Sequence, residues 1–308
     1  MEIGLRHLSC FVVVAQERTL ARAAARLHLS QPAVSKTLSE LERMAGRHLV
    51  DRGRAGTSLT AAGEQFLRYA TEVTQAMDAA AAALSGAGAA QAATVHVGAL
   101  YTVAGGLLAR AIAQLHARRP DVACTVEMAH NPELLDALKA GELDFAVGRM
   151  AEPSMMRGVS FELLYAESVA AVVRPGHPLL RTGGLVSPRA LLSYLVLIPQ
   201  AGTAPRLQAE GIFAAGGLGL PARRVETQSS SVARSLTLLS DAVWITPAHA
   251  VALDVERGWL SRVNVPVPAA AEPVGLLSRS GGRPGELAEA LMGILRDLAE
   301  RLPGPLLE

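Results

Sequence analysis

The segment Ser30-Gln31-Pro32 separates two stretches that each have the apolar spacing of a helix. Ser30 is a favoured N-cap, and Pro32 costs no hydrogen bond in a first turn because an N–H there has no partner. The segment therefore predicts that one helix ends before residue 30 and another begins at once. Gly46 then reads as the stop of the second helix. A chain with this break must carry two short helices joined by a tight turn.

The flanking sequence completes a small domain. Residues 5–16 have helical apolar spacing, and Thr19 can cap the helix that follows them. After Gly46, the stretch HLVDRGRAGTSLT predicts two short strands joined by a basic, glycine-containing turn. Two helices joined by a tight turn form a helix-turn-helix, and the two strands would then act as a wing.

The second helix of such a unit fits the major groove of DNA. Gln31 can make two hydrogen bonds to adenine, and Lys36 can reach guanine or phosphate. Each polar residue is also typical of solvated surface, so the order of the motifs carries the prediction. We expect DNA contacts from the start of the helix and from the wing, at Ser30, Gln31, Pro32, Ser35, Lys36, Arg52 and Arg54.

Charge supports this reading locally. The formal net charge of the chain is only +1, but residues 18–54 contain far more basic than acidic side chains. Phosphate attraction depends on such local concentration. The basic residues are Arg18, Arg22, Arg26, Lys36, Arg43, Arg47, Arg52 and Arg54, against Glu40, Glu42 and Asp51.

A long helix is predicted from residue 61 to about 84. Its apolar residues recur at alternating steps of four and three, which is the heptad pattern of paired helices: Phe66, Ala70, Val73, Met77, Ala80 and Leu84. We expect dimerisation through Phe66, Val73, Met77 and Leu84; the alternative is packing against the protein's own body. The following SGAGAAQAA, residues 85–93, has the composition of a linker.

From residue 94 onward, strand and helix patterns alternate, which favours a mostly parallel sheet covered by helices. Two middle crossings, near 165–173 and 262–275, suggest two lobes. The expected organisation is a winged helix-turn-helix at 1–60, a linker helix and hinge at 61–93, and an α/β effector-binding domain at 94–308. Lobe I would comprise 94–165 and 270–308, and lobe II 166–269.

Two-lobed α/β domains bind ligands at strand C-termini and helix N-termini. Hydroxyls, free backbone N–H groups and one arginine at those ends describe a site for a small, polar, anionic molecule. Each residue could instead serve as a helix cap. The expected effector contacts are Tyr101, Thr102, Val103, Asn131, Arg149, Pro199, Gln200, Thr203, Ser230 and Thr246, whereas burial is the favoured role for His96 and His130.

The stretch AAARLHLSQPAVSKTLSELERMAGRHLVDRG, with SLTAAG after it, resembles the winged helix of LysR-type transcriptional regulators. The resemblance covers all 308 residues and implies a two-lobed effector domain like that of periplasmic binding proteins. VHVGALYTVAGGLL, ELDFAVGRMAEPSMM and VVRPGHPLL resemble the branch that regulates protocatechuate catabolism and sugar uptake. The resemblance implies operator DNA as partner, a homotetramer built from two dimers, and as effector an aromatic acid, a dicarboxylate or a sugar derivative.

The chain departs from the family pattern around the wing. Ala45-Gly46 stands where Leu-Gly is usual, and Leu49-Val50 where Leu-Phe is usual. Smaller side chains bury less apolar surface, so the wing should be held more loosely. Ala55 and Gly56 replace arginines found in many members, which should weaken the grip of the wing on DNA.

Other classes of protein find little support. There is no G-x-S-x-G, P-loop, H-E-x-x-H, or G-x-G-x-x-G after a strand, so we expect no enzyme, cofactor or metal. The N-terminal segment opposes a plain solute-binding protein. No apolar run is long enough for a membrane span, and the first residues lack signal-peptide features, so a cytoplasmic protein is expected. Cys10 and Cys124 are expected to be buried thiols.

Overall fold

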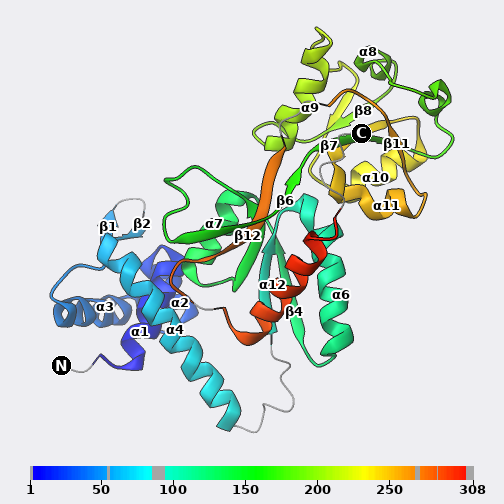
Figure 1. The fold of residues 1–308 in the computed structure, drawn as a ribbon. Helices are drawn as coiled ribbons and strands as arrows, with labels where there is room; N and C mark the ends of the chain where they lie inside the picture. The colour runs from blue at the N-terminus through cyan, green and yellow to red at the C-terminus, as the bar shows by residue number, and fades with distance from the viewer. Residues whose placement is uncertain (1–2, 54–55, 85–93, 268–270, 283, 303–308) are drawn as a thin grey trace. The chain divides into compact units, whose positions relative to one another are not determined.

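The computed structural model describes residues 3–53, 56–84, 94–267, 271–282 and 284–302. Contacts divide the chain into two compact units, one within residues 1–93 and 136–143, the other within 94–135 and 144–308 (Figure 1). Within the described residues, no helix combines the length and the apolar composition that a bilayer crossing requires. Residues 85–93, which were predicted to be a linker, lie outside the described ranges, as does Arg54.

Three helices open the first unit: α1 (Leu5–Glu17), α2 (Leu20–Arg26) and α3 (Gln31–Ala45). The predicted caps are confirmed. The Thr19 side chain accepts from Arg22 N at 3.3 Å, and Ser30 Oγ accepts from Ala33 N at 3.4 Å. Gly46 ends α3 with φ 66°, a left-handed conformation that glycine adopts without steric cost.

Two strands and a long helix follow. Strands β1 (Val50–Gly53) and β2 (Gly56–Leu59) pair antiparallel as the predicted wing. Gly56 has φ +123°, and a Cβ there would lie 2.6 Å from the Arg18 carbonyl oxygen. An arginine at this position would therefore clash in the backbone conformation that this chain adopts. Helix α4 (Ala61–Leu84) begins after Thr60, whose Oγ1 accepts from Gly63 N at 3.0 Å.

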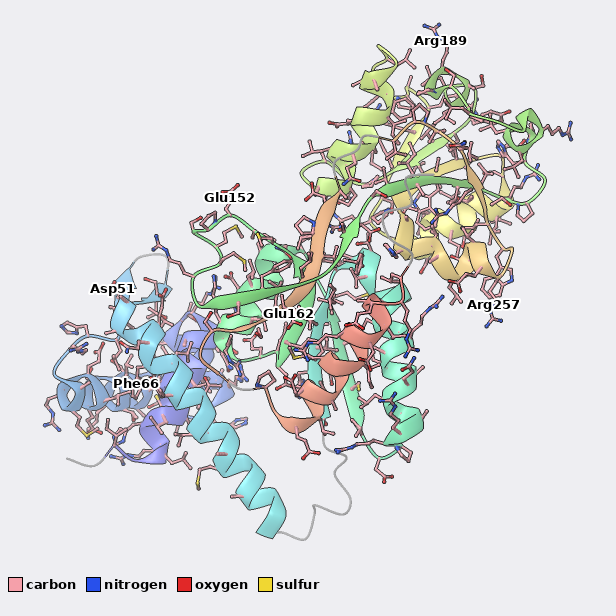
Figure 2. All side chains as sticks on the ribbon, viewed as in Figure 1. Asp51, Phe66, Glu152, Glu162, Arg189 and Arg257 are labelled. Atoms are coloured by element: carbon pink, nitrogen blue, oxygen red, sulfur yellow. The ribbon has the colours of Figure 1, made fainter. Side chains whose placement is uncertain are left out.

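The N-terminal half of α4 closes the core of this unit. The ring of Phe66 packs edge-on against Phe11, with 5.2 Å between centroids, and Leu67 and Ala70 are buried (Figure 2). They join a cluster with Val34, Leu38, Leu41, Leu49 and Val50 from α3 and the wing. The first residues of the heptad pattern therefore serve the domain's own core.

In the second unit, one mixed sheet has the order β4-β3-β5-β12-β6. Strands β3 (Thr94–Ala99), β4 (Ala123–Met128) and β5 (Phe145–Arg149) are parallel, whereas β12 (Glu272–Arg279) and β6 (Val159–Glu167) pair antiparallel. Helices α6 (Ala109–Arg118) and α12 (Glu286–Ala299) lie side by side against this sheet (Figure 1). The other helices are α5 (Tyr101–Val103), continued by a π-helical turn (Ala104–Leu108), and α7 (Asn131–Ala140), whose first half belongs to this unit.

The second sheet has the order β11-β7-β10-β8-β9 and buries both faces. Alternate residues of its strands pack with α9 (Ala204–Ala215), and the others, such as Leu197 and Trp244, pack with α10 (Ser230–Leu239). Its strands are β7 (Val169–Val173), β8 (Val196–Ile198), β9 (Arg224–Glu226), β10 (Val243–Pro247) and β11 (Ser261–Val263). The remaining helices are α8 (Pro188–Leu191) and α11 (Ala252–Glu256), with 3-10 turns at Pro178–Thr182 and Ala248–Val251.

One expectation is confirmed and another is corrected. The two described sheets are mostly parallel: four of the five strands in each run in one direction, and only β12 in the first sheet and β7 in the second, the strands that follow the crossings between the sheets, run against their neighbours. Strand β6 itself was not predicted. Leu163 is exposed and the pairing with β12 shifts register, so the strand lacks a regular alternation of buried and exposed residues. Glu162 of this strand accepts a hydrogen bond from Arg296 Nε at 2.7 Å (Figure 2). Cys10 is buried as expected, but Cys124 is only half-buried.

Candidate functional site

The start of α3 presents its polar side chains to solvent. Ser30, Gln31, Pro32 and Lys36 are exposed, and Ser35 is half-buried. The opposite side of the helix, with Val34, Leu38 and Leu41, is fully buried. The apolar face thus fixes α3 on the domain, so that its first two turns are available to a groove of DNA.

The basic surface around α3 is partly compensated. Arg22 and Arg26 both pair with Glu17, at 3.0 and 3.1 Å, so their charges are shared with a carboxylate. Lys36 and Arg43 are exposed on α3 itself. Arg52 lies on β1, but its side chain, like the whole of Arg54, is outside what the structure describes.

In the second unit, strand ends and helix starts surround one cavity. It is lined by Leu100, Tyr101, Thr102, His130, Arg149, Pro199, Thr203, Pro205, Thr227, Gln228, Ser229, Ser230, Ala233, Trp244, Thr246 and Pro247. These residues come from both sheets. Hydroxyls and one guanidinium face apolar walls of proline, leucine and tryptophan, which is the composition of a site for a small organic molecule.

Most of the expected effector contacts lie on this cavity: Tyr101, Thr102, Arg149, Pro199, Thr203, Ser230 and Thr246. Three do not line it. Val103 is buried in the core at 1% exposure. Gln200 is exposed, and its Oε1 accepts from Gln228 Nε2 at 2.8 Å, so it supports a lining residue. Asn131 supports Arg149 in a similar way.

Asn131 holds the backbone of Arg149 at two points. Its Nδ2 donates to Arg149 O at 2.8 Å, and its Oδ1 accepts from Arg149 N at 2.9 Å. The Arg149 side chain is then directed by β5 and has buried Nε and Nη2 atoms without a hydrogen-bond partner among the described residues. Burial lowers the pKa of Arg149, while the negative charge of Glu167 acts against that shift. The cavity is therefore lined by a desolvated cation, and two of its donor atoms are buried beneath the surface without a partner among the described residues.

A buried polar cluster stands beside Arg149. The strand register places Arg149, Val274 and Tyr165 in one row across β5, β12 and β6, and Glu167 is two residues beyond Tyr165 on the same face. Glu167 is 1% exposed, and its Oε1 is 3.0 Å from His249 Nδ1. Burial, and next the charge of Glu167, raises the pKa of Tyr165 well above its usual value.

One further cluster fixes the rim of the cavity. Arg206, only 5% exposed on α9, donates to the Pro199 carbonyl at 3.0 Å and to Glu226 at 2.8 Å. It thereby ties the end of β8 to the end of β9, from which Thr227 and Gln228 enter the lining. Among the residues that the structure describes, no three His, Cys, Asp or Glu side chains gather as a metal site.

Several lining or supporting residues were not predicted as effector contacts: His130, Thr227, Gln228, Trp244, Tyr165, Glu167 and His249. One of these had a signal in the sequence, because Glu167 is a carboxylate inside the apolar stretch LLYAESVAAVV. The pairing of Glu167 with His249 has no local signal, because 82 positions separate them.

Comparisons with known proteins agree with this architecture. Residues 5–64 match the family of bacterial regulatory helix-turn-helix proteins of the lysR type, and residues 88–300 match the LysR substrate binding domain. The HTH-type transcriptional regulator YdcI of Escherichia coli is 43% identical over 90% of each chain. The HTH-type transcriptional regulator PcaQ of Agrobacterium fabrum is 38% identical over 97% of this chain and 96% of its own.

Among solved structures, full-length OxyR from Pseudomonas aeruginosa is 25% identical, with a TM-score of 0.64 over 96% of this chain and 95% of that one. Both halves of the chain thus have counterparts in regulators of one kind, and those regulators are not enzymes. The chain belongs to the LysR family of DNA-binding transcriptional regulators and carries that family's effector-binding domain.

Proposed function

We propose that this regulator responds to a small carboxylate bound in the cavity of its second unit. The observation that carries the proposal is Arg149, a desolvated cation in the lining of the cavity. A carboxylate is the group that a guanidinium binds most strongly, in a bidentate geometry. The start of α10, with Ser229 and Ser230 in the lining, adds backbone donors and a positive dipole end.

The walls narrow the class of carboxylate. Leu100, Pro199, Pro205, Trp244 and Pro247 offer apolar surface to the body of the ligand. That surface favours an aromatic acid over a dicarboxylate or a sugar derivative, whose additional polar groups would lose water against it.

On the DNA side, we propose that Ser30, Gln31, Pro32, Ser35 and Lys36 contact the operator, with Arg52 and Arg54 on the wing. Exposure of the first turn of α3 supports the α3 contacts. We take residues 1–60 as the DNA-binding domain, 61–93 as linker helix and hinge, and 94–308 as effector domain in two lobes, 94–165 with 270–308 and 166–269. The regulator would act in the cytoplasm, where operator DNA lies.

We propose that α4 pairs two chains and that two dimers form the tetramer. Phe66 is engaged with Phe11, so the contact would centre on Val73 and Met77, which are 46% and 47% exposed. Leu84 was expected in this contact, but its side chain lies outside the described part of the chain.

The test is a thermal-shift panel of aromatic monocarboxylates, dicarboxylates and neutral sugars against the full-length protein. A ligand present at a hundredfold excess over its Kd stabilises the folded state by about 2.7 kcal/mol. We expect a carboxylate to raise the melting temperature of the wild type and of Arg174→Gln, a control in which the lost arginine pairs with Asp241 away from the cavity. Arg149→Gln should lose the response.

A neutral sugar that stabilises the protein as strongly as any carboxylate would contradict the proposal. So would a full carboxylate response in Arg149→Gln, because the guanidinium would then not be the anchor. Arg149→Lys distinguishes the contribution of the positive charge from that of the bidentate geometry, since lysine keeps the charge but lacks the planar guanidinium.

A further inference from the structure

Residues His48–Val50 lie between the DNA-reading helix and the long helix, and both helices hold them. Glu42, in the last turns of α3, is 9% exposed. Its Oε1 accepts from Leu49 N at 2.8 Å and from Val50 N at 3.2 Å. A single buried carboxylate oxygen thus binds two successive N–H groups at the entry to the wing.

The carbonyl groups of the same residues turn to the start of α4. Thr60 Oγ1 donates to His48 O at 2.9 Å, and Thr60 N donates to Leu49 O at 3.1 Å. Gly63 lets the helix approach this closely, since a Cβ there would lie 2.0 Å from Leu49 O. The N–H groups of this segment are therefore hydrogen-bonded to α3, and its carbonyl groups are hydrogen-bonded to Thr60 at the start of α4.

The segment has little freedom to absorb a movement of either helix. Leu49 and Val50 are 2% and 5% exposed and pack in the core with residues of α3 and α4. Val50 also pairs with Leu59 at the first rung of the wing. A rotation of α4 about its axis would displace Thr60 and, through His48–Val50, the carboxylate of Glu42.

We propose that His48–Val50 is a strap that couples the orientation of α4 to that of α3, and that Glu42 is the positioning residue on its α3 side. The inference rests on the proposed roles of α3 in reading DNA and of α4 in pairing two chains. In a dimer, the angle between these helices fixes the distance between two recognition helices. Glu42 thereby sets the spacing of the half-sites, whereas Gln31 sets their base sequence.

The experiment is selection from a random-sequence duplex library with the full-length protein, followed by titration of single and paired half-sites. Wild type should select paired half-sites of one spacing. Glu42→Ala should select the same half-site bases over a broadened range of spacings, and should bind the wild-type spacing about tenfold more weakly. Its affinity for a single half-site should change less than about twofold.

Three further variants make the result specific. Glu42→Gln keeps an acceptor oxygen and should restore the wild-type spacing. Thr60→Val removes the hydroxyl on the α4 side and should reproduce the broadened spacing, which keeps the test decisive if Glu42→Ala does not fold. Glu40→Ala removes a carboxylate two residues away that pairs with Arg6 at 3.4 Å, and should select like wild type.

Two outcomes would overturn the proposal. If Glu42→Ala and Thr60→Val weaken single and paired half-sites equally, these residues only stabilise the domain. If both keep the wild-type spacing, the strap does not transmit helix orientation. Gln31→Ala tests the underlying assignment separately: unchanged half-site bases in that variant would remove α3 from the reading role, whatever happens to the spacing.

Discussion

Each unit buries one glutamate at a junction, and the two glutamates differ in how many backbone amides and cations surround them. Glu42 gives its Oε1 to two backbone N–H groups that the fold itself supplies. Glu167 Oε1 accepts from only one backbone N–H, that of His249 at 3.2 Å, and lies 3.0 Å from Nδ1 of the same residue, while its Oε2 has no hydrogen-bond partner among the described residues. The negative charge of Glu167 partly offsets the lowering of pKa that burial causes in two arginines, Arg149 and Arg262.

The difference indicates that the contacts of Glu42 form a rigid joint between α3 and α4, whereas the contacts of Glu167 can rearrange. A carboxylate oxygen held by two successive backbone amides is fixed at two points of the chain and so transmits position. A carboxylate facing cations and a histidine can exchange partners when a ligand takes one of them. The DNA-binding unit is therefore expected to move as a rigid body. In the effector unit, ligand binding is expected to change which side chains pair with Glu167.

The largest expected effect tests how tightly the first unit is fixed. Gly63→Ala would place a methyl group against the backbone oxygen of Leu49, which no side-chain rotation can relieve. We expect the free energy of unfolding to fall by at least about 3 kcal/mol. In the second unit, a Cβ at Gly293 of α12 meets no atom within 4 Å, so Gly293→Ala should stabilise by up to about 1 kcal/mol.

Chemical denaturation of the two glycine variants measures both effects. If both variants change the free energy of unfolding by similar, small amounts, the backbone near Leu49 can relax, and the contact between α4 and Leu49 is not rigid.

Neutralising each glutamate should distinguish the two environments. Glu167→Gln leaves Arg149 and Arg262 without their shared countercharge and should cost about 2 kcal/mol of stability. Glu42→Gln keeps the acceptor for Leu49 N and should cost about 1 kcal/mol or less. Urea unfolding of both variants provides the comparison. A larger loss in Glu42→Gln would reverse the ranking and refute the distinction between the joints.

The smallest effect concerns pH. His177 is fully buried; its Nδ1 accepts from Leu179 N and its Nε2 donates to the Asp241 carbonyl, an arrangement that needs a neutral ring. Burial lowers the pKa of His177. The unfolded chain thus takes up a proton below about pH 6.5 before the folded one does, and stability falls as pH drops from there toward the lowered value.

Melting curves recorded from pH 8 to 5 should show this decline in wild type and a flatter profile in His177→Gln. Identical profiles would mean that His177 does not take part in the pH dependence of stability.

How far the sequence predicts the structure depends on how local the signal is. Thr19, Ser30 and Gly46 mark helix ends because each acts on backbone groups within a few residues. The whole DNA-binding unit could be outlined from such signals. The dimer pattern was less specific, because Phe66 satisfies the same spacing by packing on Phe11.

The cavity could be predicted only in part. Strand ends such as those before Tyr101 and at Arg149 are visible in the hydrophobic pattern, so the residues just after them were found. The neighbours of Arg149 were not found, because the strand order brings Tyr165 and Glu167 beside it through β12, which lies more than a hundred positions away in sequence. Register across a sheet has no signal in a single chain segment.

The most direct test of the account joins the two units in one assay. An operator duplex taken from library selection is titrated with full-length protein, with and without a carboxylate that stabilises it, in wild type and in Arg149→Gln. A regulator of this design should show at least about a fivefold change in operator affinity, or a changed mobility of the complex, in wild type only. A saturating carboxylate that changes neither quantity in the wild type would contradict the central claim that this cavity controls DNA binding.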